Sequence, residues 1–409
     1  MDYYYKQPKY YSDFRCLGGN CPDTCCRGWQ IIWYKNEYEK LINADCSDYL
    51  KELVEKSYKL SENENGNLYE IKLVSSVKDD TTDIIDLLTL MHEGKCPLHN
   101  EQTGLCDIQK ELGEDYLGTV CRRYPRRYFQ RGQIIVRMCS SACPAVNYML
   151  INDKNAAAFE MTIARDFDKL EDKAVTHDPN EHIKVNPYLK YRIDILDFYV
   201  ELFNKFVNVE NSIILGALSA KKISEEDAEK IPGILKEYRK QFSSGAVLKS
   251  LQSIAPNYNI KYKIVNNLIY NYFGTRKDGI DISMLHNGEQ LIKERYLQGM
   301  DNFNKAFEGR EYAFRNIAIN MFIYNFTDAF SWKINFWDYY STFASYIAVL
   351  QVFACAVGYD NEDIENKFIK ITSDLNRAMS HNKKKAEKVT NALKEIGLTT
   401  PAHLALIIK

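Results

Sequence analysis

Hydrophobic residues recur at helical spacing through the second half of the chain. From Tyr188 to Lys409, apolar positions return every three or four residues, and only three prolines occur. This pattern predicts amphipathic helices, because proline is the residue that most strongly interrupts a helix. The predicted helices cover residues 188–209, 223–242, 258–274, 283–307, 310–330, 336–357, 361–380 and 383–396.

The first part of the chain has a mixed pattern of helical and strand-like segments. Asp107 is an N-cap candidate for a short helix that Gly113 would end, and Pro144 suits the first position of another helix. Short apolar runs bounded by turn residues predict strands. The predicted elements are helices at 38–60, 108–112 and 155–170, a helix from Pro144, and strands at 29–33, 68–73 and 134–138.

These patterns predict a mainly α protein with a small α+β part. We expect an N-terminal cysteine-rich metal or cluster module at 1–153, packed on a larger all-α helical domain at 188–409. Residues 154–187 would form a connecting helix and a linker, since Asp178, Pro179 and Pro187 mark a break.

The longest uncharged run, Tyr339 to Tyr359, has the length of a membrane span. Ser341, Gln351 and several tyrosines interrupt it, so we expect a buried core helix and no membrane association. The N-terminal residues contain no apolar signal region, and we expect a cytoplasmic protein. A net charge of -2 gives no reason to expect nucleic-acid binding, and no helix-turn-helix or stacking motif is apparent.

Cysteine is the residue type that suggests a chemistry. Ten of the eleven cysteines lie at or before Cys143, and four of them lie between Cys16 and Cys26. Clustered thiols in a reducing compartment are more often metal ligands or redox groups than disulfides, and thiolates suit zinc and iron–sulfur clusters. The alternative is a set of buried structural thiols. Nine thiols within 128 residues, with Cys46 left aside, favour metal ligation.

The spacing of the thiols does not match an ordinary zinc site. Two C-x2-C pairs are missing, and the adjacent Cys25 and Cys26 are poorly placed to chelate one small ion together. They can serve two sites, or offer one thiolate to a larger cluster. Cys46, expected on a helix, and Cys355 are interpreted as core residues. His92 and His99 flank Cys96 as spare ligands or surface residues.

Several motifs carry a family resemblance. The stretch Cys16–Cys26, Arg27-Gly28-Trp29, Gly94–Leu98, Gly104–Cys106, Glu111–Leu117, Cys121–Arg126 and Cys143-Pro144 together resemble the FliB-type flagellin lysine-N-methylases. The N-terminal part of that family belongs to a wider group of metal-chelating domains with a CxxCxxCC-like signature. The resemblance covers about residues 11–150. The helical remainder is compatible in length and carries no comparable motif.

The resemblance implies a cytoplasmic enzyme that binds an iron–sulfur cluster, of the 4Fe-4S type, and S-adenosylmethionine, and that methylates lysines of flagellin. Eight ligand candidates exceed the four thiolates that one such cluster needs. The first stretch, C-x4-C-x3-C-C, is also looser than the wider signature, and Cys139 is a ninth thiol without an assigned role. The candidate ligands are Cys16, Cys21, Cys25, Cys26, Cys96, Cys106, Cys121 and Cys143.

The sequence gives little information about the methyl donor. It contains no G-x-G pair and no C-x3-C-x2-C triad, so neither a glycine-rich nucleotide fingerprint nor a radical-type triad is present. An iron with an open position could bind the amino and carboxylate groups of the donor. Arg122, Arg123 and Arg126 are candidate cofactor contacts, although compensation of cluster charge is the favoured interpretation of this arginine-rich segment.

A polar stripe on an otherwise apolar helix is the other candidate site. Asn316, Asn320, Tyr324 and Asp328 recur every four residues and would line a pocket for the acceptor lysine. Hydrogen bonds between helices, or plain exposure, explain the same stripe and are favoured. No catalytic residue is assigned. The alternative function is a non-catalytic metal-chelating or redox-sensing module, with zinc as the metal and a helical partner-binding domain.

Overall fold

The protein forms two compact units. The helical unit comprises residues 1–14, 127–142 and 146–409, and the cysteine-rich unit comprises residues 15–126 and 143–145. The expected boundaries differ from these, because residues 1–14 and 127–142 belong with the helices. The computed structural model describes residues 2–26, 32–63, 66–71, 96–165, 187–206, 208–244, 246–272, 276–277, 280–281, 289–329, 335–380 and 383–409.

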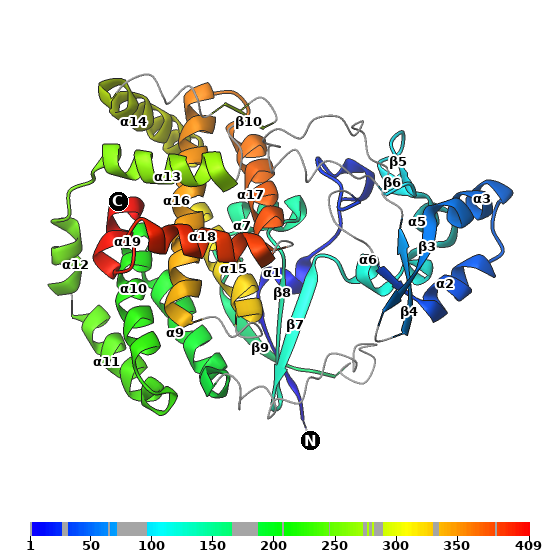
Figure 1. Ribbon diagram of the computed structural model, residues 1–409, viewed down its shortest axis with the longest axis horizontal. Helices are drawn as coiled ribbons and strands as arrows, with labels where there is room; N and C mark the ends of the chain where they lie inside the picture. Colours follow the sequence, from blue (N-terminus) through cyan, green and yellow to red (C-terminus); the bar gives the residue numbers. More distant parts are fainter. Residues whose placement is uncertain are drawn as a thin grey trace. The chain divides into compact units, whose positions relative to one another are not determined.

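Helices dominate the larger unit, as Figure 1 shows, and the prediction of a mainly α protein with some β structure is confirmed. Each predicted helix beyond residue 187 has a counterpart. Three further helices, α10, α12 and α19, were not predicted. The helices are α9 (Arg192–Lys205), α10 (Val209–Glu225), α11 (Ile231–Ser243), α12 (Ala246–Gln252), α13 (Tyr258–Tyr272), α14 (Glu289–Ala306), α15 (Tyr312–Ala329), α16 (Phe336–Asp360), α17 (Ile364–Ser380), α18 (Lys383–Glu395) and α19 (Pro401–Ile408).

Helix α16 is the core of the helical unit and contacts α10, α14 and α17 among others. Its backbone approaches α14 closely, since a Cβ atom added to Gly299 would lie 2.9 Å from the sulfur of Cys355. By length and composition α16 is the one described helix that could cross a membrane, and its apolar window is entirely buried inside the protein. The prediction of a buried core helix is therefore confirmed.

A four-stranded sheet, ordered β7-β8-β1-β9, accompanies these helices. Strand β1 pairs in parallel with β8 and antiparallel with β9. The helix predicted at 155–170 is wrong for the residues described, because 159–163 form β9. Backbone pairing with β1, from Pro8 opposite Phe159 onward, outweighs a weak local helix preference. The strands are β1 (Tyr4–Pro8), β7 (Arg126–Arg131), β8 (Ile134–Cys139) and β9 (Phe159–Ile163), and helices α1 (Tyr10–Asp13) and α7 (Pro144–Asn152) adjoin them in sequence.

The cysteine-rich unit is an α+β arrangement around a three-stranded antiparallel sheet, ordered β2-β4-β3. The single helix predicted over 38–60 is wrong, since α2 ends at Ile42 and α3 begins after Ser47. The Ser47 hydroxyl accepts a hydrogen bond from the Leu50 amide, which starts a new helix at that point. The elements are β2 (Ile32–Tyr34), β3 (Tyr58–Asn63), β4 (Gly66–Ile71), α2 (Lys35–Ile42), α3 (Asp48–Ser57), β5 (His99–Asn100), β6 (Leu105–Cys106), α5 (Asp107–Leu112) and α6 (Thr119–Arg123).

Helix α5 confirms one terminus of the predicted helix at 108–112 and corrects the other. Cys106 occupies the N-cap position, so Asp107 is the first helical residue instead of the cap. Gly113 ends the helix with φ +85°, a conformation that glycine adopts without strain. The predicted strand at 68–73 is confirmed by β4, and Pro144 begins α7 as expected. Residues 166–186, where the linker was predicted, lie outside the described residues.

Candidate functional site

The hydrophobic core of the cysteine-rich unit is lined with thiols. Trp33, Leu50, Leu98 and Ile108 are almost completely buried, and Cys96 is buried among them. Four more cysteines pack against this core while remaining partly accessible, namely Cys26, Cys46, Cys106 and Cys121. The sulfur atoms therefore lie at the edge of an apolar core, where water is scarce and a charged thiolate is costly.

Four thiols interact with one another around Cys26. Burial raises the pKa of Cys121, and the charges of Cys26, Cys106 and Cys96 raise it further. Burial likewise raises the pKa of Cys96, with Cys26 as the next cause, and raises the pKa of Cys106 to about 11. The Cys96 amide also donates a hydrogen bond of 2.8 Å to the Cys26 carbonyl. Segments from three parts of the sequence thus bring their thiols together.

Cys25 connects this group to a further thiol, that of Cys143. A side-chain hydrogen bond with Cys26 is the largest cause that raises the pKa of Cys25, followed by burial and by the charges of Cys26, Cys121 and Cys143. Cys25 is exposed when the whole residue is considered, but these neighbours surround its sulfur. The adjacent thiols of Cys25 and Cys26 therefore contact each other, although neighbouring side chains were expected to be poorly placed to act together. Six of the eight predicted ligands form one group of interacting thiols.

Cys16 and Cys21 lie on the turn that precedes this group. The Gly18 amide donates to the Cys16 sulfur at 3.4 Å, and the Cys21 thiol donates to the Asp23 carbonyl at 2.7 Å. The same turn touches the β5–β6 hairpin, since a Cβ atom on Gly104 would lie 2.9 Å from the Gly19 carbonyl oxygen. The two glycines thus allow the first cysteine stretch to approach the segment that carries Cys106.

Glu37 fixes the position of helix α6, which carries Cys121. Its carboxylate accepts hydrogen bonds from the Tyr34 amide at 2.9 Å and from the Thr119 amide at 2.7 Å. One side chain therefore caps the starts of both α2 and α6. Gly118 precedes α6 and lies against Trp33, because a Cβ atom there would be 2.6 Å from the indole ring. The contact of Glu37 with Thr119 joins residues 82 positions apart, and that of Gly118 with Trp33 is also long-range. Local sequence patterns therefore do not predict either contact.

Two buried polar atoms lie in this core without a hydrogen-bond partner among the described residues. They are the indole nitrogen of Trp33 and the hydroxyl of Tyr58. Burial raises the pKa of Tyr58, and the charges of Cys121, Cys96 and Cys106 contribute, which places the phenol beside the thiols. Trp33 and Tyr58 pack edge to face with ring centroids 5.3 Å apart. Unpaired buried donors of this kind are costly unless an acceptor binds there.

The donor chemistry of this site fits a thiolate-bound group. All eleven cysteines are free of disulfide bonds. Within the described part of the chain, no three His, Cys, Asp or Glu side chains stand ready to hold a single metal ion. Mutual repulsion and burial keep the thiols protonated, and a cation would reverse both effects by favouring thiolates. Whether these cysteines are ligands stays a prediction.

Comparison with known proteins decides the family. Residues 201–407 match the family model described as the FliB lysine N-methylase C-terminal domain, which is half of the chain. The chain belongs to the FliB lysine N-methylase family. This assignment rests on the helical unit, whereas the motifs that suggested the family lie in the N-terminal part. It confirms the prediction of a lysine-methylating enzyme.

Known relatives of this FliB family member come from Salmonella. "Lysine-N-methylase" of Salmonella choleraesuis is 24% identical over 311 residues, which is 74% of this chain and 67% of the relative. The protein of the same name from Salmonella typhimurium has the same identity and coverage. "Flagellar biosynthetic protein FliU" of Salmonella muenchen is 29% identical over 152 residues, 37% of this chain and 79% of the relative. No solved structure matches the chain.

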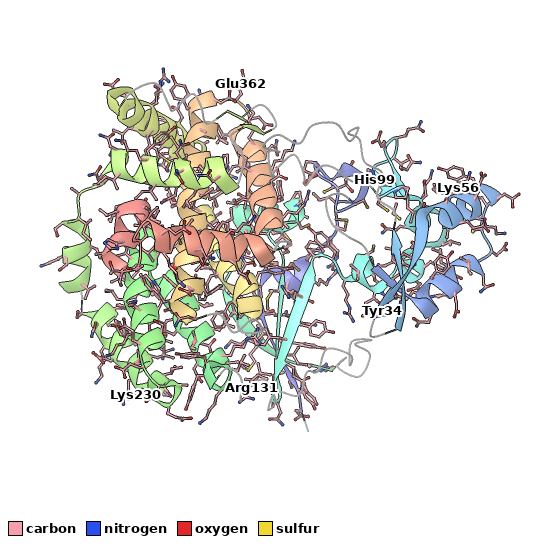
Figure 2. All side chains as sticks on the ribbon, viewed as in Figure 1. Tyr34, Lys56, His99, Arg131, Lys230 and Glu362 are labelled. Carbon is pink, nitrogen blue, oxygen red and sulfur yellow. The ribbon has the colours of Figure 1, made fainter. Side chains whose placement is uncertain are left out.

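The remaining cysteines of this FliB family member have structural positions. Cys139 is fully buried at the end of β8 in the helical unit, and Cys355 is fully buried in α16, as expected for a core residue. Cys46 lies between α2 and α3, so its predicted place on a helix is wrong. His99, labelled in Figure 2, pairs across the β5–β6 hairpin with Cys106. His92 lies outside the described residues.

The arginine-rich segment is divided between the two units. Arg122 and Arg123 are half-buried at the end of α6, and Arg126 is exposed at the start of β7. In the helical unit, the guanidinium of Arg127 lies 5.1 Å from the centroid of the Tyr324 ring. Arg137 stacks on Tyr5 at 3.3 Å. Cofactor binding by Arg122, Arg123 and Arg126 stays a prediction.

Two residues of the polar stripe on α15 make buried hydrogen bonds, as the favoured interpretation predicted; the ring of a third, Tyr324, lies against Arg127, and the side chain of Asp328 lies outside the described part of the structure. Asn316 donates to the carbonyls of Leu150 at 3.0 Å and Asp153 at 2.9 Å. Asn320 donates to the Cys139 carbonyl at 3.0 Å and to the Ser141 hydroxyl at 2.7 Å. Both asparagines are completely buried, so they hold the end of α7 and the loop after β8 and do not line a substrate pocket.

Proposed function

We propose that the protein methylates lysine side chains of flagellin in the cytoplasm, with S-adenosylmethionine as methyl donor and an iron–sulfur cluster bound by the cysteine-rich unit. Family membership supports the lysine methylation, and the flagellar name of one relative supports a flagellar substrate. The mutual interaction of six thiols, four of which lie at one apolar core, is the observation that supports the cluster. The family match favours this enzymatic function over the alternative of a non-catalytic metal-chelating or redox-sensing module.

Cys26, Cys96, Cys106 and Cys121 would supply the four thiolates. The charge of Cys26 raises the pKa of each of the other three thiols, and the four come from three parts of the sequence. Clusters accept such irregular spacing because their ligands grip a body larger than one ion. The phenol of Tyr58 and the indole nitrogen of Trp33 offer hydrogen bonds at the edge of this group, which is the kind of contact that tunes bound clusters.

Cys25 interacts with Cys26, Cys121 and Cys143. We place the methyl donor beside Cys25 and Cys143. Its carboxylate would pair with Arg122 and Arg123, which would also balance the negative charge of the thiolates. When bound, the donor supplies the methyl group. The acceptor lysine must lose a proton before it can attack.

Anaerobic purification tests the cluster directly. We expect coloured protein that contains iron and sulfide, and a mass increase of flagellin by whole methyl groups when S-adenosylmethionine is added. Cys26→Ser and Cys121→Ser should lose the colour and the iron. Cys46→Ser is the matched control, because Cys46 packs on the same core outside the group of six, and it should retain both. Colourless protein with stoichiometric zinc would overturn the proposal.

Cys25→Ser separates the donor from the cluster. Cys25 is not one of the four proposed ligands, so if the donor binds beside it, this variant should lose binding of S-adenosylmethionine, measured by equilibrium dialysis, and retain its iron. Full donor binding by the variant would show that the donor binds elsewhere. The same measurement on Arg122→Met tests the role of charge, with a predicted loss of donor affinity and unchanged iron.

A further inference from the structure

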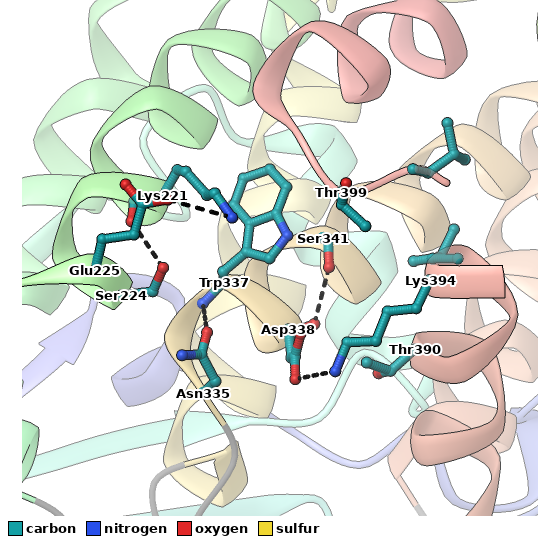
Figure 3. A pocket seen from close by; sticks show the side chains of 12 residues that line it. Lys221, Ser224, Glu225, Asn335, Trp337, Asp338, Ser341, Thr390, Lys394 and Thr399 are labelled. Carbon is teal, nitrogen blue, oxygen red and sulfur yellow. Dashed lines mark hydrogen bonds and ion pairs between the residues drawn. The ribbon is translucent and has the colours of Figure 1, made fainter. Parts of the chain in front are cut away.

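The helical unit contains a pocket of about 390 Å³, a size within the range of small-ligand sites. Figure 3 shows side chains of α10, α16 and α18 converging on it, with Trp337 in the middle. The pocket lies entirely within residues 201–407, which match the family model. Its lining includes two acid–base pairs and one aromatic ring, and none of the sequence patterns predicted it.

Two lysine ammonium groups of the chain itself occupy the walls of this pocket. The Lys221 ammonium lies 5.1 Å from the centroid of the Trp337 ring and 3.4 Å from the Glu225 carboxylate. The Lys394 ammonium lies 2.7 Å from the Asp338 carboxylate. An aromatic face next to carboxylates is the chemistry that recognises ammonium ions. The pocket therefore already contacts two ammonium groups, those of Lys221 and Lys394.

The ring at the centre of the pocket is buried and anchored, whereas the lysine side chains beside it are more exposed. Trp337 is 5% exposed, and its amide donates to the Asn335 side chain at 2.8 Å, which fixes the start of α16. The Asp338 side chain is 19% exposed, whereas that of Lys394 is 51% exposed. Exposed ion pairs of this kind are weak and exchange readily. The side chains of Lys221 and Lys394, 31% and 51% exposed, are therefore held by weak interactions.

We infer that this pocket binds a lysine side chain presented by the protein substrate, with Trp337 contacting the ammonium and Asp338 and Glu225 balancing its charge. In the unliganded protein Lys221 and Lys394 stand in for that lysine and compete with it. The inference rests on the lysine-methylating function of the family but requires neither the cluster nor the methyl donor. A site for an anion would instead use the two lysines as its ligands.

Fluorine NMR of the full chain tests this inference. The protein has four tryptophans, and after labelling with 5-fluorotryptophan the Trp337→Phe variant identifies the resonance of Trp337. Titration with Nα-acetyl-L-lysine methylamide should shift that resonance saturably. The uncharged norleucine analogue should leave it unchanged. Asp338→Asn and Glu225→Gln should each weaken binding by about two- to fivefold, the effect of losing one exposed charge pair.

Substitution of Lys221 and Lys394 gives the most discriminating test, because the inference predicts that affinity for the lysine analogue increases. Lys221→Met and Lys394→Met remove the competitors, so each should tighten binding by about two- to fivefold. Lys230→Met is the matched control, because Lys230 pairs with Glu226 at 2.6 Å outside the pocket lining. Weaker binding in the two pocket variants, or no saturable shift, would overturn the inference. Binding is measured without donor or cluster, so a failure here is distinct from a failure of the proposed function.

Discussion

The side chain of Asn320 accepts a hydrogen bond of 2.6 Å from the hydroxyl of Tyr10, which lies 310 residues earlier in the chain. The same hydroxyl accepts from the Cys139 amide at 2.9 Å, and Asn320 donates to the Cys139 carbonyl. The N-terminal segment, the end of β8 and α15 are thus joined at one buried polar point. Because the atoms are buried, loss of one partner leaves the others without compensation.

The first prediction concerns this buried network. Asn320→Ala should lower the free energy of unfolding by about 3 kcal/mol, since it removes three buried hydrogen bonds, to the Tyr10 hydroxyl, the Cys139 carbonyl and the Ser141 hydroxyl. Tyr10→Phe should cost less, about 1–2 kcal/mol, because it removes the hydroxyl itself. The double variant should cost less than the sum, with a coupling of about 1 kcal/mol in urea unfolding.

Asn325→Ala is the matched control on the same helix. Asn325 is half-buried, and its amide donates to the Met321 carbonyl one turn away. Asn325→Ala should lower the free energy of unfolding much less than Asn320→Ala does, because water can replace a local hydrogen bond at the helix surface. If the Tyr10 and Asn320 variants prove additive, the network does not act as a unit.

The second prediction separates the empty and the loaded states of the cysteine-rich unit. Tyr58→Phe removes a buried hydroxyl that has no hydrogen-bond partner among the described residues. The metal-free protein should therefore be as stable as the wild type or more stable, by up to about 1–3 kcal/mol. In the cluster-loaded protein, the same change removes a hydrogen-bond donor and should lower the reduction potential.

Redox titration and thermal unfolding measure the two effects on one protein. Tyr38→Phe is the control, because Tyr38 contacts the Tyr58 ring at 5.2 Å on the same core. It should leave the reduction potential unchanged. A Tyr58→Phe variant with an unaltered potential would show that the hydroxyl does not face the cluster.

Local patterns predicted the helices of the larger unit but not the contacts that join distant segments. Apolar spacing located α13 to α18, because each helix buries a stripe against the core. It failed for 155–170, where pairing of β9 with β1 decides the structure. It also missed α10, where Gly216 lies mid-helix against the Tyr340 hydroxyl and weakens the local signal.

The candidate sites show the same division. Counting cysteines identified the six thiols that interact, since their number and residue type carry the signal. The sequence did not show that Cys25 and Cys26 share a hydrogen bond, because this depends on the backbone of one turn. The pocket around Trp337 was invisible for another reason. Its lining comes from three helices and the adjoining loops between residues 221 and 399, and each part alone resembles an ordinary helix surface.

The third prediction concerns Lys261, which is buried in the helical unit with 1% of its surface exposed. Its ammonium donates to the Gln351 side chain and to the Ile408 carbonyl, both at 3.0 Å. Burial lowers the pKa of Lys261 to about 8, and the nearby charges of Glu210 and Cys355 oppose this shift. The amine thereby links α13 to α16 and to the C-terminal helix α19.

The lowered pKa fixes the sign of a pH effect. Between pH 8 and the ordinary lysine pKa of 10.5, the folded protein binds fewer protons at Lys261 than the unfolded chain does. Stability from this residue therefore rises with pH across that window, by up to about 1.4 kcal/mol per pH unit. Urea unfolding of wild type and Lys261→Met at several pH values isolates the effect, because other titrating groups cancel in the difference. That difference should grow in favour of the wild type from pH 8 to pH 10. A flat difference across this range would mean that Lys261 titrates normally despite its burial.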